Sequence, residues 1–161
     1  MSSTLVFPSE AFPQFPRIEI ERPEGWNALA AVGLPLALAK DVPAGVFRPN
    51  VLVTLTRLGA DHTVDQARKA FTAKTKALPR YKEESSHVVD REDCEGFTVE
   101  GRFAGGRGEI IHQIVTVMVI NRGYVFDVVE ITGTCSALTG DNGKKEIREI
   151  LSSVHVDISG S

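Results

Sequence analysis

The amino-acid sequence predicts an α+β fold, an antiparallel β-sheet flanked by helices in a three-layer α/β/α sandwich. The first observation is the order of elements between residues 50 and 156: one strand pattern, one helix pattern, four strand patterns and a second helix pattern. The second is that short turns join the last four strands, which is typical of an antiparallel meander. The third is that each helix has an apolar face, which needs a sheet face to cover.

Composition limits the class of protein. The 161 residues are 42% hydrophobic and 24% charged, which is typical of one soluble folded domain. A formal net charge of -3 provides no overall positive field, so we expect no nucleic-acid partner. The longest apolar run, residues 114–120, is far shorter than the about 20 residues that cross a bilayer, so we expect no membrane insertion. The first residues lack the features of a secretory signal, which favours a cytoplasmic location.

Proline interrupts the first fourteen residues. Phe7 precedes Pro8 and Phe12 precedes Pro13, and proline continues neither a helix nor a central strand. We therefore expect residues 1–14 to form an extended Phe/Pro arm whose rings pack against another surface. Residues 15–158 are expected to form a single α+β domain. Phe7 and Phe12 are candidate binding residues on this arm.

The next segment leads into the domain. Residues 17–22 alternate as a short strand, and a turn then places Trp26, the only tryptophan, against the body of the protein. Trp26 is a candidate binding residue, although burial statistics favour a core position for a tryptophan. In the apolar segment 29–39, Pro35 restricts any strand to an edge or a bulge. Residues 41–50 contain two prolines and a glycine and predict a loop.

A strand pattern and a helix pattern come next. In residues 51–58, β-branched residues and leucines alternate between two faces, which predicts a strand. Thr63 and Gln66 match a capping box at the start of a helix. Apolar residues then recur at helical spacing until Pro79, which ends the predicted helix.

Acidic side chains crowd the region of the next two strand patterns, residues 81–89 and 97–103. They are Glu83, Glu84, Asp90, Glu92, Asp93 and Glu95. Paired carboxylates perform acid–base chemistry when they share a cleft, whereas a solvated acidic loop between strands is the ordinary explanation. Such a loop also suits a basic partner. Glu83, Glu84 and Asp93 are therefore candidate binding residues.

The last third of the chain predicts a hairpin and a helix. Residues 110–120 are apolar on both faces, which indicates a central strand covered on both sides. A tight turn at 121–123 leads into a strand at 124–131. After a loop rich in glycine, threonine and serine, Asp141 or Asn142 caps the second helix. Its apolar face consists of Ile147, Ile150, Leu151 and Val154.

The run Arg48–Thr54, the capped helix, the meander and a last helix ending near residues 152–155 together resemble the PsbP-like fold group. Within that group they are similar to the actinobacterial LpqN-type family. The resemblance covers roughly residues 17–156 and is one of fold. It implies a non-catalytic adaptor, chaperone or assembly factor that binds other proteins. LpqN-type proteins are lipoproteins, and this chain departs from them because no lipidation cysteine lies near its N-terminus.

Residues that carry chemistry are scattered. The four histidines lack the spacing of metal ligands, so we expect no metal site and no cofactor; they are His62, His87, His112 and His155. His112 shares a face with apolar residues, which favours a satisfied core imidazole. Glycines at 105–108 predict a hairpin turn and not a phosphate loop. The two cysteines favour free thiols in a reducing compartment.

The sequence therefore predicts a non-catalytic module that binds another protein. The surfaces available for this are the sheet edge, the Phe/Pro arm, and the loops at 41–50 and 133–142. One alternative is a carrier that holds a small hydrophobic ligand between the sheet and a covering element. Another is a thiol-dependent enzyme in which Cys135, in its polar loop, has a depressed pKa. A homo-oligomer formed through an edge strand or the arm is also compatible with the sequence.

Overall fold

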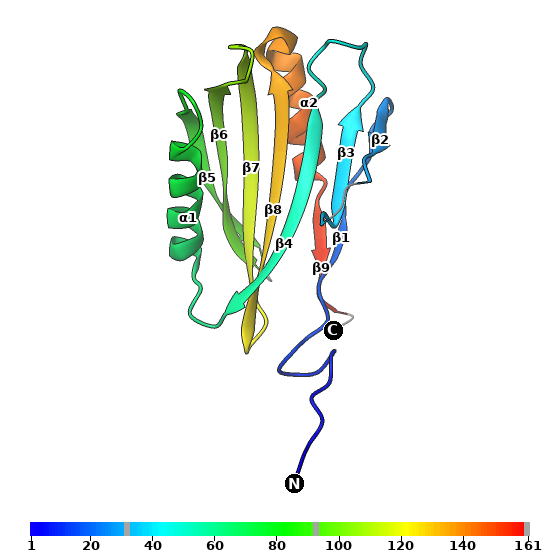
Figure 1. The fold of residues 1–161 in the computed structure, drawn as a ribbon, viewed down its shortest axis with the longest axis vertical. Helices are drawn as coiled ribbons and strands as arrows, with labels where there is room; N and C mark the ends of the chain where they lie inside the picture. The colour runs from blue at the N-terminus through cyan, green and yellow to red at the C-terminus, as the bar shows by residue number, and fades with distance from the viewer. Residues whose placement is uncertain (31–32, 92–93, 160–161) are drawn as a thin grey trace.

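The computed structural model describes residues 1–30, 33–91 and 94–159 (Figure 1). Its strands are β1 (Arg17–Glu19), β2 (Trp26–Ala28), β3 (Leu36–Lys40), β4 (Asn50–Gly59), β5 (Lys82–Arg91), β6 (Cys94–Ala104), β7 (Ile110–Asn121), β8 (Val125–Ser136) and β9 (His155–Asp157). Its helices are α1 (Val64–Lys76), the 3₁₀ helix η1 (Ala137–Thr139) and α2 (Gly140–Ser152). The α+β class predicted from the sequence is confirmed.

Seven strands form one antiparallel sheet in the order β2-β3-β4-β8-β7-β6-β5. The predicted meander is confirmed, because β5, β6, β7 and β8 follow one another both in sequence and in space. The order leaves β2 and β5 as the two outer strands. Pro35 immediately precedes β3, which is an inner strand between β2 and β4, so the expectation of an edge or a bulge there is wrong. Proline is tolerated because it lies outside the hydrogen-bonded ladder.

A second, two-stranded sheet pairs β1 with β9 in antiparallel orientation. The sequence pattern predicts a strand near β1 but none after the last helix. The three residues of β9 are too few for a strand pattern to be recognised. The strand with which they pair, β1, lies more than a hundred residues earlier in the sequence. Figure 1 shows this small sheet beside β3, at the end of the molecule from which the N-terminal arm projects, and Ile18 and Val156 pack against the apolar cluster that includes α2.

The two faces of the large sheet carry separate apolar clusters. Along β7, Ile114, Met118 and Ile120 pack in the cluster that includes α2. The alternate residues of β7, Val115, Val117 and Val119, pack in the cluster that includes α1. The two helices therefore lie on opposite faces, and β7 is buried on both sides as the sequence predicts.

The two helices begin in different ways. The Thr63 hydroxyl accepts a hydrogen bond from the backbone N–H of Gln66 at 3.3 Å, so the predicted cap of α1 is confirmed. The predicted caps of α2 are wrong, because Asp141 and Asn142 lie inside the helix. Instead, β8 continues to Ser136, whose hydroxyl caps η1, and η1 runs directly into α2. The polar loop expected at 133–142 is therefore the end of β8, then η1, then the start of α2.

Candidate functional site

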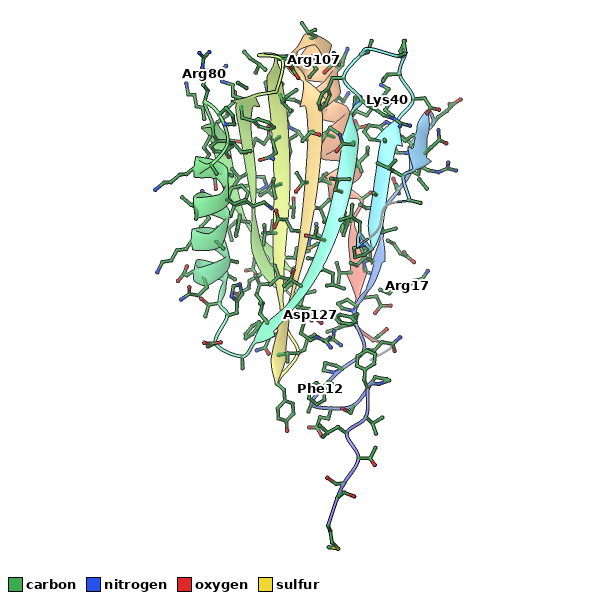
Figure 2. All side chains as sticks on the ribbon, in the orientation of Figure 1. Phe12, Arg17, Lys40, Arg80, Arg107 and Asp127 are labelled. Atoms are coloured by element: carbon green, nitrogen blue, oxygen red, sulfur yellow. The ribbon has the colours of Figure 1, made fainter. Side chains whose placement is uncertain are left out.

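The Phe/Pro arm exposes aromatic rings at one end of the sheet. The Phe7 side chain is 57% exposed and that of Phe12 is 44% exposed. The backbone folds back locally, since Ser9 N donates to the Phe12 carbonyl at 2.8 Å, and the rings of Phe7 and Phe15 lie 5.9 Å apart. Figure 2 shows Phe12 and Asp127 toward the end of the molecule from which the arm projects. The rings expected to pack against another surface are thus in large part open to solvent.

A buried ionic cluster lies where the arm meets the sheet. Arg57 of β4 and Asp127 of β8 are paired across the two strands. The Arg57 guanidinium donates two hydrogen bonds, of 2.7 and 2.9 Å, to the Asp127 carboxylate. Arg122 donates to the same carboxylate at 2.8 Å. The Asp127 side chain is 0% exposed and that of Arg122 is 3% exposed. Charges this deeply buried are stable only while every partner is present.

The same arginine holds the base of the arm. Arg57 Nη1 donates to the Pro13 carbonyl at 2.6 Å, and its guanidinium lies 4.1 Å from the centre of the Phe15 ring. The cation–π contact and the hydrogen bond both need the orientation that Asp127 imposes on Arg57. The ionic cluster therefore fixes residues 13–15, and the arm begins from an immobilised base.

Trp26 lies in the core. Its side chain is 1% exposed at the start of β2, in the apolar cluster beneath α2. A partner would reach this ring only after the surrounding strands had separated. The burial of Trp26 therefore agrees with a core position, which was the alternative to a binding role.

Two of the acidic candidates, Glu83 and Glu84, lie on β5 and not in a loop. Glu83 Oε1 accepts from Arg68 of α1 at 2.6 Å, and Glu84 Oε1 lies 3.5 Å from Nδ1 of His112. The two carboxylates thus have different partners and form no acid–base pair. Asp93, the third acidic candidate, lies outside the described residues.

His112 is only partly satisfied. Its Nδ1 atom is buried without a good hydrogen-bond partner among the described residues, so the expectation of a satisfied core imidazole is wrong. Burial and the nearby Lys144 ammonium lower the pKa of His112 despite Glu84. Across the described ranges, no group of three or more metal-ligating side chains is assembled.

Two loops that are distant in sequence meet at the other end of the sheet. Val46 and Phe47 in the loop before β4 approach Leu138 in η1, which is 94% exposed. Together with Arg107, they line an open groove of about 770 Å³. Figure 2 places Arg107 at the end of the sheet opposite Phe12. The arm and the groove are therefore separate surfaces.

Comparison with known proteins identifies the fold. No protein-family model matches the chain, and no curated protein matches its sequence. Among solved structures, it is similar to LpqN of Mycobacterium tuberculosis, described as involved in cell envelope biogenesis. The TM-score is 0.74 at 14% identity, over 88% of this chain and 84% of that one. It is also similar to PsbP (CyanoP) from Synechocystis sp. PCC 6803, with a TM-score of 0.58 at 16% identity, over 96% of this chain and 98% of that one. The fold is PsbP-like.

The likeness of this PsbP-like sheet to LpqN, expected from the sequence, is thereby confirmed at the level of fold. No helix in the described part of the chain is long and apolar enough to cross a membrane.

Cys135 occupies a poor position for a nucleophile in this PsbP-like sheet. It lies near the end of β8, where its side chain is 1% exposed and packs in the cluster beneath α2. Burial raises the pKa of the thiol, although a hydrogen bond with Thr139 and the charge of Lys144 oppose the rise. A thiol-dependent enzyme requires the opposite direction. The geometry therefore argues against that alternative.

We expect Cys135 to react with iodoacetamide at least about 100-fold more slowly in the native protein than in denaturant, because the thiol is buried and its pKa is raised. Mass spectrometry of the peptide that contains Cys135 after timed quenching measures this rate. Equal rates in the two conditions would contradict the expectation and restore the enzyme alternative.

Proposed function

We propose that this protein is a non-catalytic protein-binding module, an adaptor, chaperone or assembly factor, that contacts its partner through the Phe/Pro arm. The observation that carries the proposal is the combination of exposed aromatic rings at Phe7 and Phe12 with a base fixed by buried ion pairs. Exposed apolar surface of this kind marks interaction sites on proteins. Aromatic rings are also enriched at the centres of interfaces.

The fixed base favours binding by the arm. A freely jointed peptide loses the conformational entropy of each residue that a complex orders. Here Arg57 already holds Pro13 and Phe15, so a partner has to order only the residues that precede them. The arm leads directly into β1, which β9 pairs, so the segment is held on both sides of Pro16.

Several expectations from the sequence belong to this proposal. They are the division into an arm at residues 1–14 and a domain at 15–158, the three-layer arrangement of that domain, and a cytoplasmic location. The proposal involves no cofactor and no nucleic-acid partner. Glu83, Glu84 and Asp93 remain candidates for contact with a basic partner.

The groove at the opposite end supports one alternative, a carrier of a small hydrophobic ligand. Its volume of about 770 Å³ is within the range of ligand sites, and Val46, Phe47 and Leu138 provide apolar lining. It differs from the cavity expected from the sequence, because it lies between two loops at the end of the sheet.

The test is affinity capture with the wild-type protein and a Phe7→Ser, Phe12→Ser variant, followed by mass spectrometry of bound proteins and small molecules. We expect one stoichiometric protein partner and a loss of about tenfold or more in the variant, because aromatic anchors carry most of an interface's binding energy. Leu138→Ser, which removes an exposed apolar side chain far from the arm, is the matched control.

The variants separate the two functions. A partner retained by the arm variant and lost with Leu138→Ser would contradict the arm proposal. A bound small molecule without any protein partner, lost with Leu138→Ser, would establish the carrier instead.

A further inference from the structure

The long outer strand β5 offers a second interaction surface. It is the terminal strand of the seven-stranded sheet, and no strand among the described residues pairs with its outer side. Its ten residues are exposed except for Val89, which is partly buried. In a β-strand at a sheet edge, the outward backbone N–H and C=O groups are available to another strand. Figure 1 shows β5 at the side of the sheet beside α1.

The charges of β5 disfavour a second copy of this chain at that edge. Two copies paired antiparallel around the centre of the strand would place Lys82 opposite Arg91 and Glu83 opposite Asp90. Like charges directly opposite each other destabilise a strand pair. An irregularity in the pairing between Glu83 and Ser85 leaves residues 85–91 as the regular part of this edge. The occupant that this edge favours is therefore a different chain.

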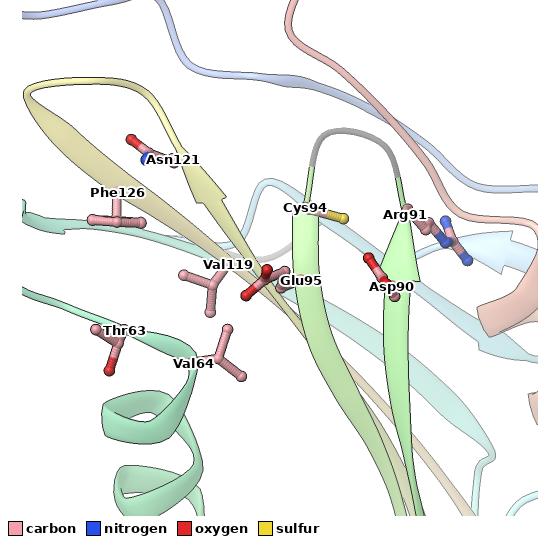
Figure 3. Close-up of a pocket in the computed structure, with 9 residues that line it drawn as sticks. All are labelled: Thr63, Val64, Asp90, Arg91, Cys94, Glu95, Val119, Asn121 and Phe126. Atoms are coloured by element: carbon pink, nitrogen blue, oxygen red, sulfur yellow. The ribbon is translucent and has the colours of Figure 1, made fainter.

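A groove beside the strand indicates the chemistry of that chain. Val88, which is 80% exposed, and Phe97 lie with Val64 along a groove of about 410 Å³ between α1 and the outer strands. Asp90 and Glu95 are cross-strand partners and line the same groove, although both are negative. Figure 3 shows these two carboxylates on neighbouring strands near Val64. The groove thus combines an apolar lining with a pair of like charges that a cation would stabilise.

The nearby cations are engaged elsewhere. Arg68 is bound to Glu83 at 2.6 Å and lies over the rings of Phe71 and Phe97. Arg91 donates to the Val154 carbonyl at 3.2 Å. Within the described residues, Asp90 and Glu95 have no ion pair. Although Arg68 also lines the groove, Asp90 and Glu95 are open to a positive charge from another molecule.

We propose that β5 accepts an extended, basic segment of a partner protein as an additional antiparallel or parallel strand. Backbone hydrogen bonds hold the segment to the edge, and its alternate side chains lie about 5 Å from those of β5 on each face. On the face that carries α1, lysine or arginine side chains reach Asp90 and Glu95, and an apolar side chain packs on Val88. This surface is distinct from the arm.

The probe is a fluorescent peptide of about ten residues in which lysine or arginine alternates with valine. Its binding is measured by fluorescence anisotropy, and backbone hydrogen exchange locates it. We expect slower exchange in residues 82–91. Two control peptides have the same length: one replaces every second valine with proline, which removes strand-forming N–H groups, and one replaces the cations with glutamate. Each is expected to bind at least about tenfold more weakly.

Two variants test the groove. The Asp90→Asn, Glu95→Gln double variant is expected to weaken peptide binding about fivefold or more, because it removes the carboxylates that attract the cations of the peptide. Val88→Lys is expected to weaken binding by a similar factor, because it adds a charge that repels those cations. All three side chains lie on the surface groove, so circular dichroism should show an unchanged fold. Leu138→Lys adds the same charge as Val88→Lys at the far end and should leave binding within about twofold.

The proposal is overturned if the basic peptide fails to bind, if the proline peptide binds equally well, or if protection falls outside β5. The Phe7→Ser, Phe12→Ser variant should bind the peptide like the wild type. Loss of peptide binding in the groove variants alone therefore reports on the β5 edge. Loss of partner capture in the arm variant alone reports on the proposed function.

Discussion

Replacing Asp127 with alanine is expected to lower the free energy of unfolding by about 3–5 kcal/mol. The substitution leaves Arg57 and Arg122 without the carboxylate that both of them bind at the inner end of the arm. A buried guanidinium without a counter-charge pays the full cost of its lost hydration. Urea denaturation followed by circular dichroism measures the change, provided that the slope of the transition stays constant.

The matched control is Glu19→Ala, which removes the carboxylate of an ion pair on the surface. Arg17 and Glu19 are both largely exposed, so the loss should stay below about 1 kcal/mol. A loss below about 1 kcal/mol for Asp127→Ala as well would show that the buried cluster is not needed for stability. The arm variant keeps this cluster, so stability and partner capture can be separated.

Replacing Trp26 with alanine is expected to cost about 3–5 kcal/mol, because it empties the largest buried side chain of the cluster beneath α2. Its indole Nε1 is buried without a hydrogen-bond partner among the described residues. Trp26→Phe removes that unpaired group and keeps most of the apolar volume, so its loss should be about 1–2 kcal/mol.

Circular dichroism is the readout for both Trp26 variants, because the chain has no other tryptophan to report on folding. A fully stable Trp26→Ala variant that loses partner capture would reverse the assignment and make Trp26 a binding residue. An unstable variant with capture retained at low temperature agrees with the core position.

The fold was accessible from local patterns wherever a pattern is long. The alternation in β4 and the two apolar faces of β7 each involve many residues and agree with the structure. The cap at Thr63 also agrees, because its two residues are only three positions apart. The errors fall where the deciding contact is distant. Gly133 is predicted to be a loop residue, yet it lies in β8. A side chain at this position would collide with Ile147 of α2. Its lack of a side chain lets the helix approach the strand closely.

The candidate site was only partly accessible. The arm follows from its prolines, but its anchor was missed. A signal for it was present: Arg57 falls in phase with the buried Val51 and Val53, and Asp127 falls in phase with the buried Val129. Two opposite charges at buried positions of two strands predict a pair. The groove at the other end could not be foreseen, because it depends on how two loops meet in space.

The pairing of β1 with β9 bears on how the chain is made. The ribosome synthesises the chain from its N-terminus, so β1 emerges long before β9, the strand that pairs with it. Contacts of such large sequence separation also form late in folding, because closing a long loop costs entropy. During synthesis the aromatic arm therefore stays attached to an unpaired β1 until β9 has been made. Until then, the exposed rings of Phe7 and Phe12 and the unpaired β1 make this end of a nascent chain prone to association.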